Sequence, residues 1–257
     1  MNLGLEGRVA LVGGASRGLG RAIAEELAGE GASVAVCARE SDSLYETANA
    51  LGAVALPADL SVEGEPARIV HECAARFGRL DIVVANAGGP PAGGFERFVA
   101  ADWERAAALL VSSAVELATA AVPHMRERGW GRILCVTSIT AERPVQNLLL
   151  SNALRPAVAG FARSLAREVA RDGITVNTIL PGYTRTERVD ELSEATAQRE
   201  GIGVADARAQ LEAQIPIGRL GEPRELAAAA AFLVSERAGY ITGAALPVDG
   251  GWLLGMF

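Results

Sequence analysis

The stretch that most constrains the fold of this chain is Arg8–Gly20, RVALVGGASRGLG. Its apolar run, Val9–Val12, is typical of a short buried strand. The glycines that crowd the turn after this strand are Gly14, Gly18 and Gly20. Apolar residues three or four positions apart then indicate a helix. A strand, a glycine turn and a helix N-terminus favour a phosphate group, because the backbone can approach it and the free N–H groups favour its charge.

The glycine spacing is G-x-x-x-G-x-G, which differs from the G-x-G-x-x-G of many dinucleotide sites. Taken alone, the spacing fits equally a tight strand-to-helix turn that binds nothing. The remainder of the chain therefore has to decide between a phosphate site and a purely structural turn.

Strands and helices alternate along the whole sequence, which predicts parallel βαβ units joined by right-handed crossovers. We expect an α/β fold: one domain, residues 1–257, with a doubly wound parallel sheet of about seven strands and helices on both faces. The polar segment 186–217 predicts a lid at the ligand edge of the sheet. The predicted strands are Val9–Val12, Ser33–Ala38, Ala53–Leu56, Leu80–Ala85, Arg132–Thr137, Ile174–Leu180 and Ala244–Val248.

Longer helices are predicted over Glu65–Phe77, over Asp102–Arg128, from Ser138 to about Arg171, and over Pro223–Val234. With 257 residues, half of them hydrophobic, the chain can bury one large core. We expect no signal peptide and no membrane span, and a cytoplasmic location.

A net charge of −7 argues against a nucleic-acid partner. The three cysteines lack metal-ligand spacing and are expected to be small buried hydrophobes, and the two histidines to stand alone on helices. No metal site is predicted. All 24 basic residues are arginine.

Several motifs in order along the chain make it resemble the short-chain dehydrogenase/reductase family, closest to its β-ketoacyl-acyl-carrier-protein reductase branch. The motifs are the glycine turn, Asp59-Leu60, Asn86-Ala87-Gly88, Gly131-Arg132-Ile133, Ser138, Pro181-Gly182, Thr242-Gly243 and Asp249-Gly250-Gly251. This resemblance covers essentially the whole length. It implies a Rossmann-like sheet, a nicotinamide cofactor and often a tetramer.

The resemblance also assigns places around that cofactor. Asp59 and Leu60 would flank the adenine, and Asn86, Ala87 and Gly88 would lie on the ribose side. The residues that would meet the nicotinamide end are Pro181, Gly182, Thr184 and Thr186. Together with the turn residues Gly14, Ser16, Arg17, Gly18, Leu19 and Gly20, and with Arg39 and Arg155, they form the predicted cofactor set.

The second predicted strand bears on the choice of cofactor. NAD sites place an acid at the end of this strand to hold the ribose 2′-hydroxyl. Here Ala38 takes that place, followed by Arg39, with Arg17 facing it from the glycine turn. Two guanidinium groups suit a 2′-phosphate, so we expect NADP(H) to be preferred, with NAD(H) possible.

The chain departs from the family pattern at the catalytic positions. The family uses Asn, Ser, Tyr and Lys, the last two spaced Y-x-x-x-K. Ser138 matches the serine, but Ser151 stands at the tyrosine position, Arg155 at the lysine position and Leu110 at the asparagine position. The chain thus resembles an atypical subgroup with a degenerate tetrad. A second departure is Gly13, where the family usually has threonine, which predicts a looser turn.

These replacements change what the site can do. A serine is a much poorer acid than a tyrosine whose pKa is lowered by a lysine, and an arginine keeps its charge and relays no proton. We therefore expect Ser138 and Ser151 to hydrogen-bond a substrate oxygen, and Arg155 to supply fixed charge to it or to the ribose. Tyr183 is the candidate alternative acid; it equally fits a packing residue at the lid hinge. Avoidance of lysine would explain Arg155, but neither Ser151 nor Leu110.

Three functions remain open from the sequence. The first is an NAD(P)-dependent oxidoreductase acting on a small or acyl-type carbonyl or alcohol. The second is a dinucleotide-binding regulator or sensor without turnover, and the third a non-redox lyase or isomerase on the same scaffold. Apolar faces at Asp102–Arg128, Ser151–Arg171 and Trp252–Phe257 predict a homotetramer, with a dimer as the alternative.

Overall fold

A computed structural model describes residues 2–253 and has seven parallel strands in the order β3-β2-β1-β4-β5-β6-β7. The expected fold class and strand number are confirmed. The strands are β1 (Val9–Val12), β2 (Ser33–Ala38), β3 (Val54–Pro57), β4 (Ile82–Ala85), β5 (Gly131–Val136), β6 (Ile174–Pro181) and β7 (Ala245–Val248). The chain starts at the centre, runs out to β3 and returns to β4, so β1 and β4 are neighbours.

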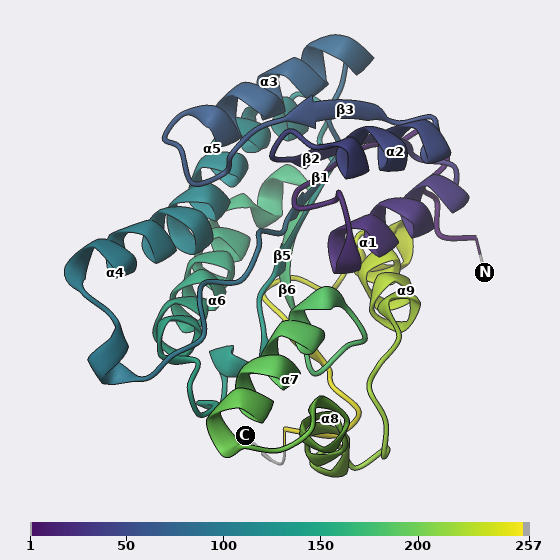
Figure 1. The fold of residues 1–257 in the computed structure, drawn as a ribbon. Helices are drawn as coiled ribbons and strands as arrows, with labels where there is room; N and C mark the ends of the chain where they lie inside the picture. The colour runs from purple at the N-terminus through teal and green to yellow at the C-terminus, as the bar shows by residue number, and fades with distance from the viewer. Residues whose placement is uncertain (1, 254–257) are drawn as a thin grey trace.

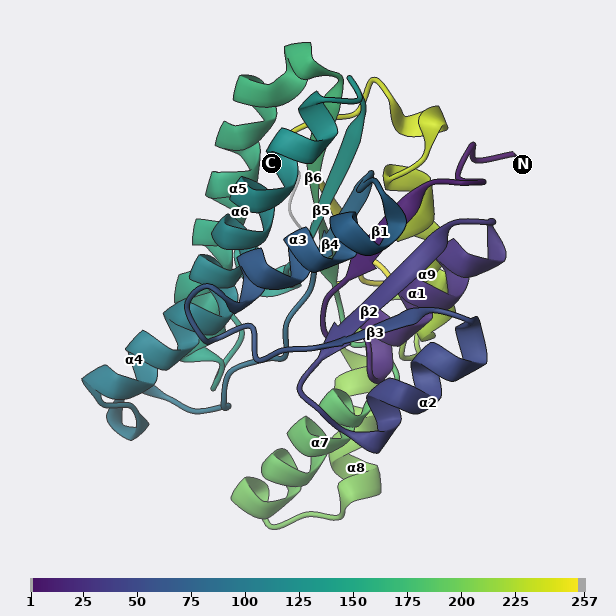
Figure 2. The same ribbon diagram turned by 90° about the horizontal axis from the view of Figure 1, so that it is seen from above.

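Helices cover both faces of the sheet, and Figures 1 and 2 show α3, α5 and α6 on one face and α1, α2 and α9 on the other. The pair α7 and α8 lies apart from these layers, below the sheet in both views. The helices are α1 (Gly18–Gly29), α2 (Asp42–Leu51), α3 (Glu65–Phe77), α4 (Ala100–Ala107), α5 (Ser113–Arg126), α6 (Leu149–Val169), α7 (Glu187–Glu200), α8 (Val204–Ala213) and α9 (Pro223–Leu233).

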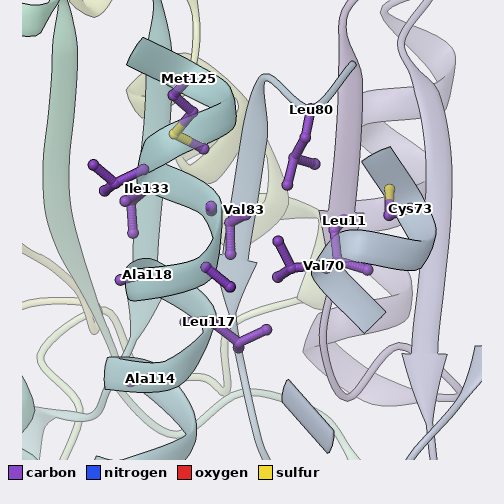
Figure 3. Close-up of a cluster of buried hydrophobic side chains, with 14 of the residues drawn as sticks. Leu11, Val70, Cys73, Leu80, Val83, Ala114, Leu117, Ala118, Met125 and Ile133 are labelled. Carbon is purple, nitrogen blue, oxygen red and sulfur yellow. The ribbon is translucent and has the colours of Figure 1, made fainter. Parts of the chain in front are cut away.

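The two faces of the sheet form two apolar layers, because successive side chains of a strand point to opposite sides. In β1, Val9 and Leu11 join the layer under α3, α5 and α6, whereas Ala10 and Val12 join the layer under α1 and α9. Figure 3 shows part of the first layer, where Leu117 of α5 is drawn with side chains from the sheet and from α3. This double burial fixes the strands and, with them, the loops at their ends.

The chain between β4 and β5 differs from the single helix expected over Asp102–Arg128. A π-helical turn, Ala108–Ser112, separates α4 from α5. It is accompanied by a side-chain hydrogen bond from the Ser113 hydroxyl to the Leu109 carbonyl. Such turns insert one residue into a helix and are frequent at functional sites.

The segment after β5 also differs from the expectation. A short 3₁₀ turn, Ile139–Ala141, follows Ser138, and α6 begins only at Leu149. Pro144 lacks a backbone donor, and Asn147 has a φ of 60°, so the segment between them leaves helical geometry. The result is a loop beside the carboxyl end of β5.

The two histidines do not stand alone, as the sequence suggested. Nδ1 of His71 on α3 lies 3.2 Å from Nε2 of His124 on α5, with the rings edge to face. This pair links two helices that pack on the same side of the sheet.

Among residues 2–253, one continuous helical stretch, Ala100–Arg126, is long and apolar enough to cross a membrane. Half of its most apolar window is buried inside the fold. Its buried residues include Leu117, Ala121 and Met125, which belong to the core layer, so we interpret it as a core helix.

Candidate active site

The glycine turn is fixed by hydrogen bonds to two neighbouring strands. The amide of Gly13 donates to the Val84 carbonyl at 3.0 Å, and the amide of Ala15 donates to the Cys37 carbonyl at 2.9 Å. From the end of β4, Nδ2 of Asn86 donates to the Gly13 carbonyl at 2.9 Å and to that of Gly14 at 3.4 Å. The turn therefore spans the crevice where β1 and β4 meet.

The turn is also closely packed against α1, which explains why it is rich in glycine. A Cβ on Gly20 would lie 2.2 Å from the Gly14 carbonyl oxygen, and Gly14 itself has a φ of 57°. A Cβ on Gly13 would lie 2.6 Å from the Asn86 carbonyl oxygen. Gly13 thus permits a close approach to the residue that follows β4, and the looser turn expected from the sequence stays a prediction.

The first turn of α1 presents backbone N–H groups, and a Glu187 carboxylate oxygen lies 3.8 Å from where a Gly18 Cβ would be. Arg17 is the N-cap residue of α1 and forms no side-chain capping bond, and the first turn contains no acidic residue. The N–H groups at such an end carry a partial positive charge. Arg17 and Arg39 are both exposed, and neither forms an ion pair with an acid within residues 2–253.

The other predicted cofactor residues lie around the same edge of the sheet. Asp59 accepts hydrogen bonds from the Ser61 amide and hydroxyl at 2.9 and 2.7 Å, and these bonds lower the pKa of Asp59. On the far side, the methyl group of Thr186 lies 3.6 Å from where a Gly18 Cβ would be. The glycine turn and the loop after β6 therefore lie side by side at this edge, and the cofactor contacts assigned to them stay predictions.

Two serine hydroxyls lie at the end of β5 and the start of α6. Oγ of Ser138 accepts a hydrogen bond from the Thr140 amide at 3.2 Å, which leaves its own hydrogen available to another acceptor. Ser151 is buried, and no residue within 2–253 forms a hydrogen bond to its hydroxyl. Both hydroxyls can therefore donate to a substrate oxygen.

Arg155 lies one helical turn after Ser151, so the two side chains share one face of α6. Its Nη1 donates to the carbonyls of Val136 and Thr137 at 3.1 and 2.7 Å, which places the guanidinium directly beside the residue preceding Ser138. Burial, with a smaller contribution from the charge of Arg188, lowers the pKa of Arg155 to about 10. The group stays protonated at neutral pH.

The Nε of Arg155 is shielded from solvent and has no hydrogen-bond partner among residues 2–253. Arg155 also lines a small cavity of about 10 Å³, together with Asn86, Ser113 and Leu110 of the π-helical turn. A buried donor without a partner is costly, so this nitrogen is available to an acceptor. The sequence identified Leu110 but carried no signal for the π-helical turn that presents it.

Tyr183 lies in a separate apolar cluster with Val189, Ile215 and Leu220. Its ring packs edge to face on Trp252, with ring centroids 6.1 Å apart, and burial raises the pKa of its hydroxyl. This environment makes it a weaker acid than a solvated tyrosine. Its role as the alternative acid stays a prediction.

Sequence reasoning missed Arg188, which reaches from α7 to the loop after β4. Its Nη2 donates to the Pro90 carbonyl at 2.8 Å, and its Nη1 pairs with Glu191 at 3.1 Å. A basic residue in the first turn of a helix was the only available signal.

The cysteines are buried, and burial raises the pKa of Cys37, Cys73 and Cys135 to about 12 each, so they are unreactive thiols. Within residues 2–253 no group of three metal-ligating side chains comes together.

This parallel sheet, with its glycine turn at the point where the strand order reverses, defines a dinucleotide-binding protein with a Rossmann-like fold. A family model described as enoyl-(acyl carrier protein) reductase matches residues 14–253. The chain is 38% identical to the 3-oxoacyl-[acyl-carrier-protein] reductase FabG of Escherichia coli, over 97% of this chain and 98% of the relative.

Solved structures agree with these sequence matches. L-sorbose reductase from Gluconobacter frateurii, in complex with NADPH and L-sorbose, has a TM-score of 0.94 and 35% identity, with each chain fully covered. An actinorhodin polyketide ketoreductase variant with NADPH has a TM-score of 0.92 and 31% identity, covering 96% of this chain and 97% of its own. The chain belongs to the short-chain dehydrogenase/reductase family of NAD(P)-dependent oxidoreductases.

The contact between Gly20 and Gly14 provides a direct test of the turn. Gly20→Ala should destabilise the protein by about 1–3 kcal/mol, because the added methyl overlaps the Gly14 carbonyl. The matched control is Gly29→Ala at the other end of α1, where a Cβ would meet nothing within 4 Å. That change should be neutral or stabilising by up to about 1 kcal/mol in urea unfolding. Equal free energies of unfolding for the two variants would contradict the close approach.

Proposed function

We propose that the chain is an NADPH-dependent carbonyl reductase with a degenerate catalytic tetrad, in which Ser151, Arg155 and Leu110 stand for Tyr, Lys and Asn. The observation that carries this proposal is the juxtaposition of Arg155 with the end of β5. Its hydrogen bonds to Val136 and Thr137 put a half-buried positive charge beside the residue that precedes Ser138.

Bound NADPH supplies a hydride to the carbonyl carbon. The chain's own residues then have to manage the negative charge that develops on the carbonyl oxygen. On this proposal, Ser138 and Ser151 donate hydrogen bonds to that oxygen, and the charge of Arg155 stabilises it electrostatically. A solvent water gives the oxygen its proton, since neither serine is an adequate acid at neutral pH.

The contacts of Arg155 narrow its role in this proposal. Its Nη1 is already used by two backbone carbonyls, so that nitrogen holds the end of β5 in place. The remaining donors, including the partnerless Nε, carry any contact to substrate or ribose. A lysine has one nitrogen for both tasks, whereas an arginine divides them between two or three.

A second function, a dinucleotide-binding regulator without turnover, would use the same cofactor-binding residues but catalyse no reaction. A third, a non-redox lyase or isomerase, would use the serines and Arg155 on a bound substrate. Purified protein mixed with NADPH and a panel of carbonyl compounds separates these functions by absorbance at 340 nm. Loss of absorbance supports the reductase, and cofactor binding without turnover favours the others.

Cofactor preference rests on Arg17 and Arg39, which form no ion pair within residues 2–253. Arg39→Ala should weaken NADPH binding about 10–100-fold in calorimetric titration, because it removes charge-assisted hydrogen bonds to the 2′-phosphate, and should leave NADH binding unchanged. Arg76→Ala on α3 removes an exposed arginine paired with Glu72 and serves as the control. NADH binding by the parent protein as tightly as NADPH would contradict the preference.

The catalytic proposal predicts a gain of function. Ser151→Tyr combined with Arg155→Lys should raise reduction of simple ketones about 10²–10⁴-fold, because it restores a side-chain acid. Arg155→Lys alone is the control and should bring no such gain, while Arg155→Ala should abolish native turnover. A double variant that binds NADPH normally and stays inert would favour the regulator or the lyase.

A homotetramer in the cytoplasm, with α7 and α8 as a lid over the site, completes the proposal. Support for assembly comes from the outer face of α6, where Ala153, Ala157 and Gly160 are exposed and leave a smooth surface. The apolar end Trp252–Phe257 was expected to contribute, but residues 254–257 lie outside the described part of the chain.

Light scattering should give about four times the monomer mass of 26.6 kDa. Gly160→Glu should reduce that mass, because it places a charge in a helix–helix contact. Ala75→Glu, at an exposed position on α3, should leave it unchanged. A parent protein at the monomer mass would rule out the assembly.

A further inference from the structure

Arg188 is held against the loop that follows β4. Its Nη2 donates to the Pro90 carbonyl at 2.8 Å. A Cβ on Gly89 would lie 3.2 Å from Nε and 3.4 Å from Cζ of this arginine, so the guanidinium covers the backbone of a residue without a side chain. Glu191 forms an ion pair with Nη1 of Arg188. The Glu191 side chain is largely exposed, so this ion pair lies on the solvent side of the guanidinium.

The sheet order places this contact between the loops that follow β4 and β6, the two strands that flank β5. Arg188 follows β6, and Pro90 follows β4. Because β5 lies between β4 and β6, a link between their carboxyl ends passes across the end of β5. Ser138 follows the end of β5, and Arg155 donates a hydrogen bond to the carbonyl of the preceding residue, Thr137.

Two guanidinium groups from different elements therefore lie at the same edge of the sheet, that of Arg188 on the loop after β4 and that of Arg155 at the end of β5. The charge of Arg188 adds to the larger effect of burial in lowering the pKa of Arg155. No carboxylate within residues 2–253 pairs with Arg155, and its buried Nε lacks an acceptor. Like charges that face each other repel, and an anion bound between them removes that repulsion.

We propose that this site selects carbonyl substrates that carry a free carboxylate within one or two carbons of the carbonyl, with Arg188 as the residue that binds the carboxylate. The inference rests on the proposed reductase function and names its substrate class. Arg188 retains N–H donors beyond its contacts with Pro90 and Glu191, and a guanidinium fork matches a carboxylate. A 2-oxo or 3-oxo carboxylate places its two polar groups close enough to span Arg188 and the serines.

A purely mechanical role is the competing explanation. In that case Arg188 only ties α7 to Pro90, and its loss would affect charged and neutral substrates alike. Charge recognition instead affects only the substrate that carries the carboxylate. The two explanations therefore differ in the ratio of kcat/KM for a matched pair of substrates.

The experiment compares 3-oxobutanoate with its neutral ethyl ester, using NADPH and the full-length protein. The parent should prefer the carboxylate about 10–100-fold, and Arg188→Gln should bring the ratio close to one. Arg188→Lys keeps the charge and should retain most of the preference. Arg199→Gln removes the same charge from the far end of α7, where Arg199 pairs with Glu200, and should leave the ratio unchanged.

A binding measurement separates failure of this inference from failure of the reductase function. Butanoate, which cannot be reduced by hydride transfer, should bind the NADPH-loaded parent in calorimetry and bind Arg188→Gln at least tenfold more weakly. Arg188-dependent butanoate binding without turnover of either ketone would refute the reductase and keep the anion site. Turnover of both ketones with no preference, or equal butanoate binding by the two proteins, would overturn the inference.

Discussion

The site depends on one constraint of topology, the reversal of strand order between β1 and β4. Because the chain leaves β1 for β2 and later returns on the other side, the loops after β1 and β4 diverge and leave a crevice. Asn86 spans this crevice by hydrogen bonds to the carbonyls of Gly13 and Gly14. The phosphate turn and the segment that begins at Asn86 are thereby held as one unit, and their separation is fixed before any ligand binds.

A second constraint is the charge placed at the carboxyl end of β5. Arg155 is the C-terminal member of a serine–arginine pair on α6 and is bonded to the strand through Val136 and Thr137. A half-buried cation that pairs with no carboxylate within residues 2–253 is costly to the folded protein. That cost is understandable if the site uses the charge, and this reasoning underlies both the proposed oxyanion stabilisation and the proposed recognition of a carboxylate.

Much of this arrangement could be predicted from the sequence, and the failures share a cause. The alternation of strands and helices predicted the sheet, because buried strands and amphipathic helices have distinct periodicities. The π-helical turn at Ala108–Ser112 could not be predicted, since its one-residue insertion leaves the apolar pattern nearly intact. Arg188 was missed because its contact with Pro90 joins positions 98 residues apart. Contacts of that kind depend on the completed sheet order and have no local signature.

On the proposed function, Leu110, Ser151 and Arg155 replace three members of the catalytic tetrad, and the three replacements are best considered together. Leu110 and Arg155 line the same small cavity, and the apolar side chain of Leu110 offers no hydrogen-bond acceptor. Ser151 removes the phenol, and Arg155 keeps its proton because its pKa stays near 10. Each change alone would impair a proton relay. In combination they leave a site with fixed positive charge and two hydroxyl donors, which suits stabilisation of negative charge better than donation of a proton. On the proposed function, such a site gains most from a substrate that brings an anion of its own.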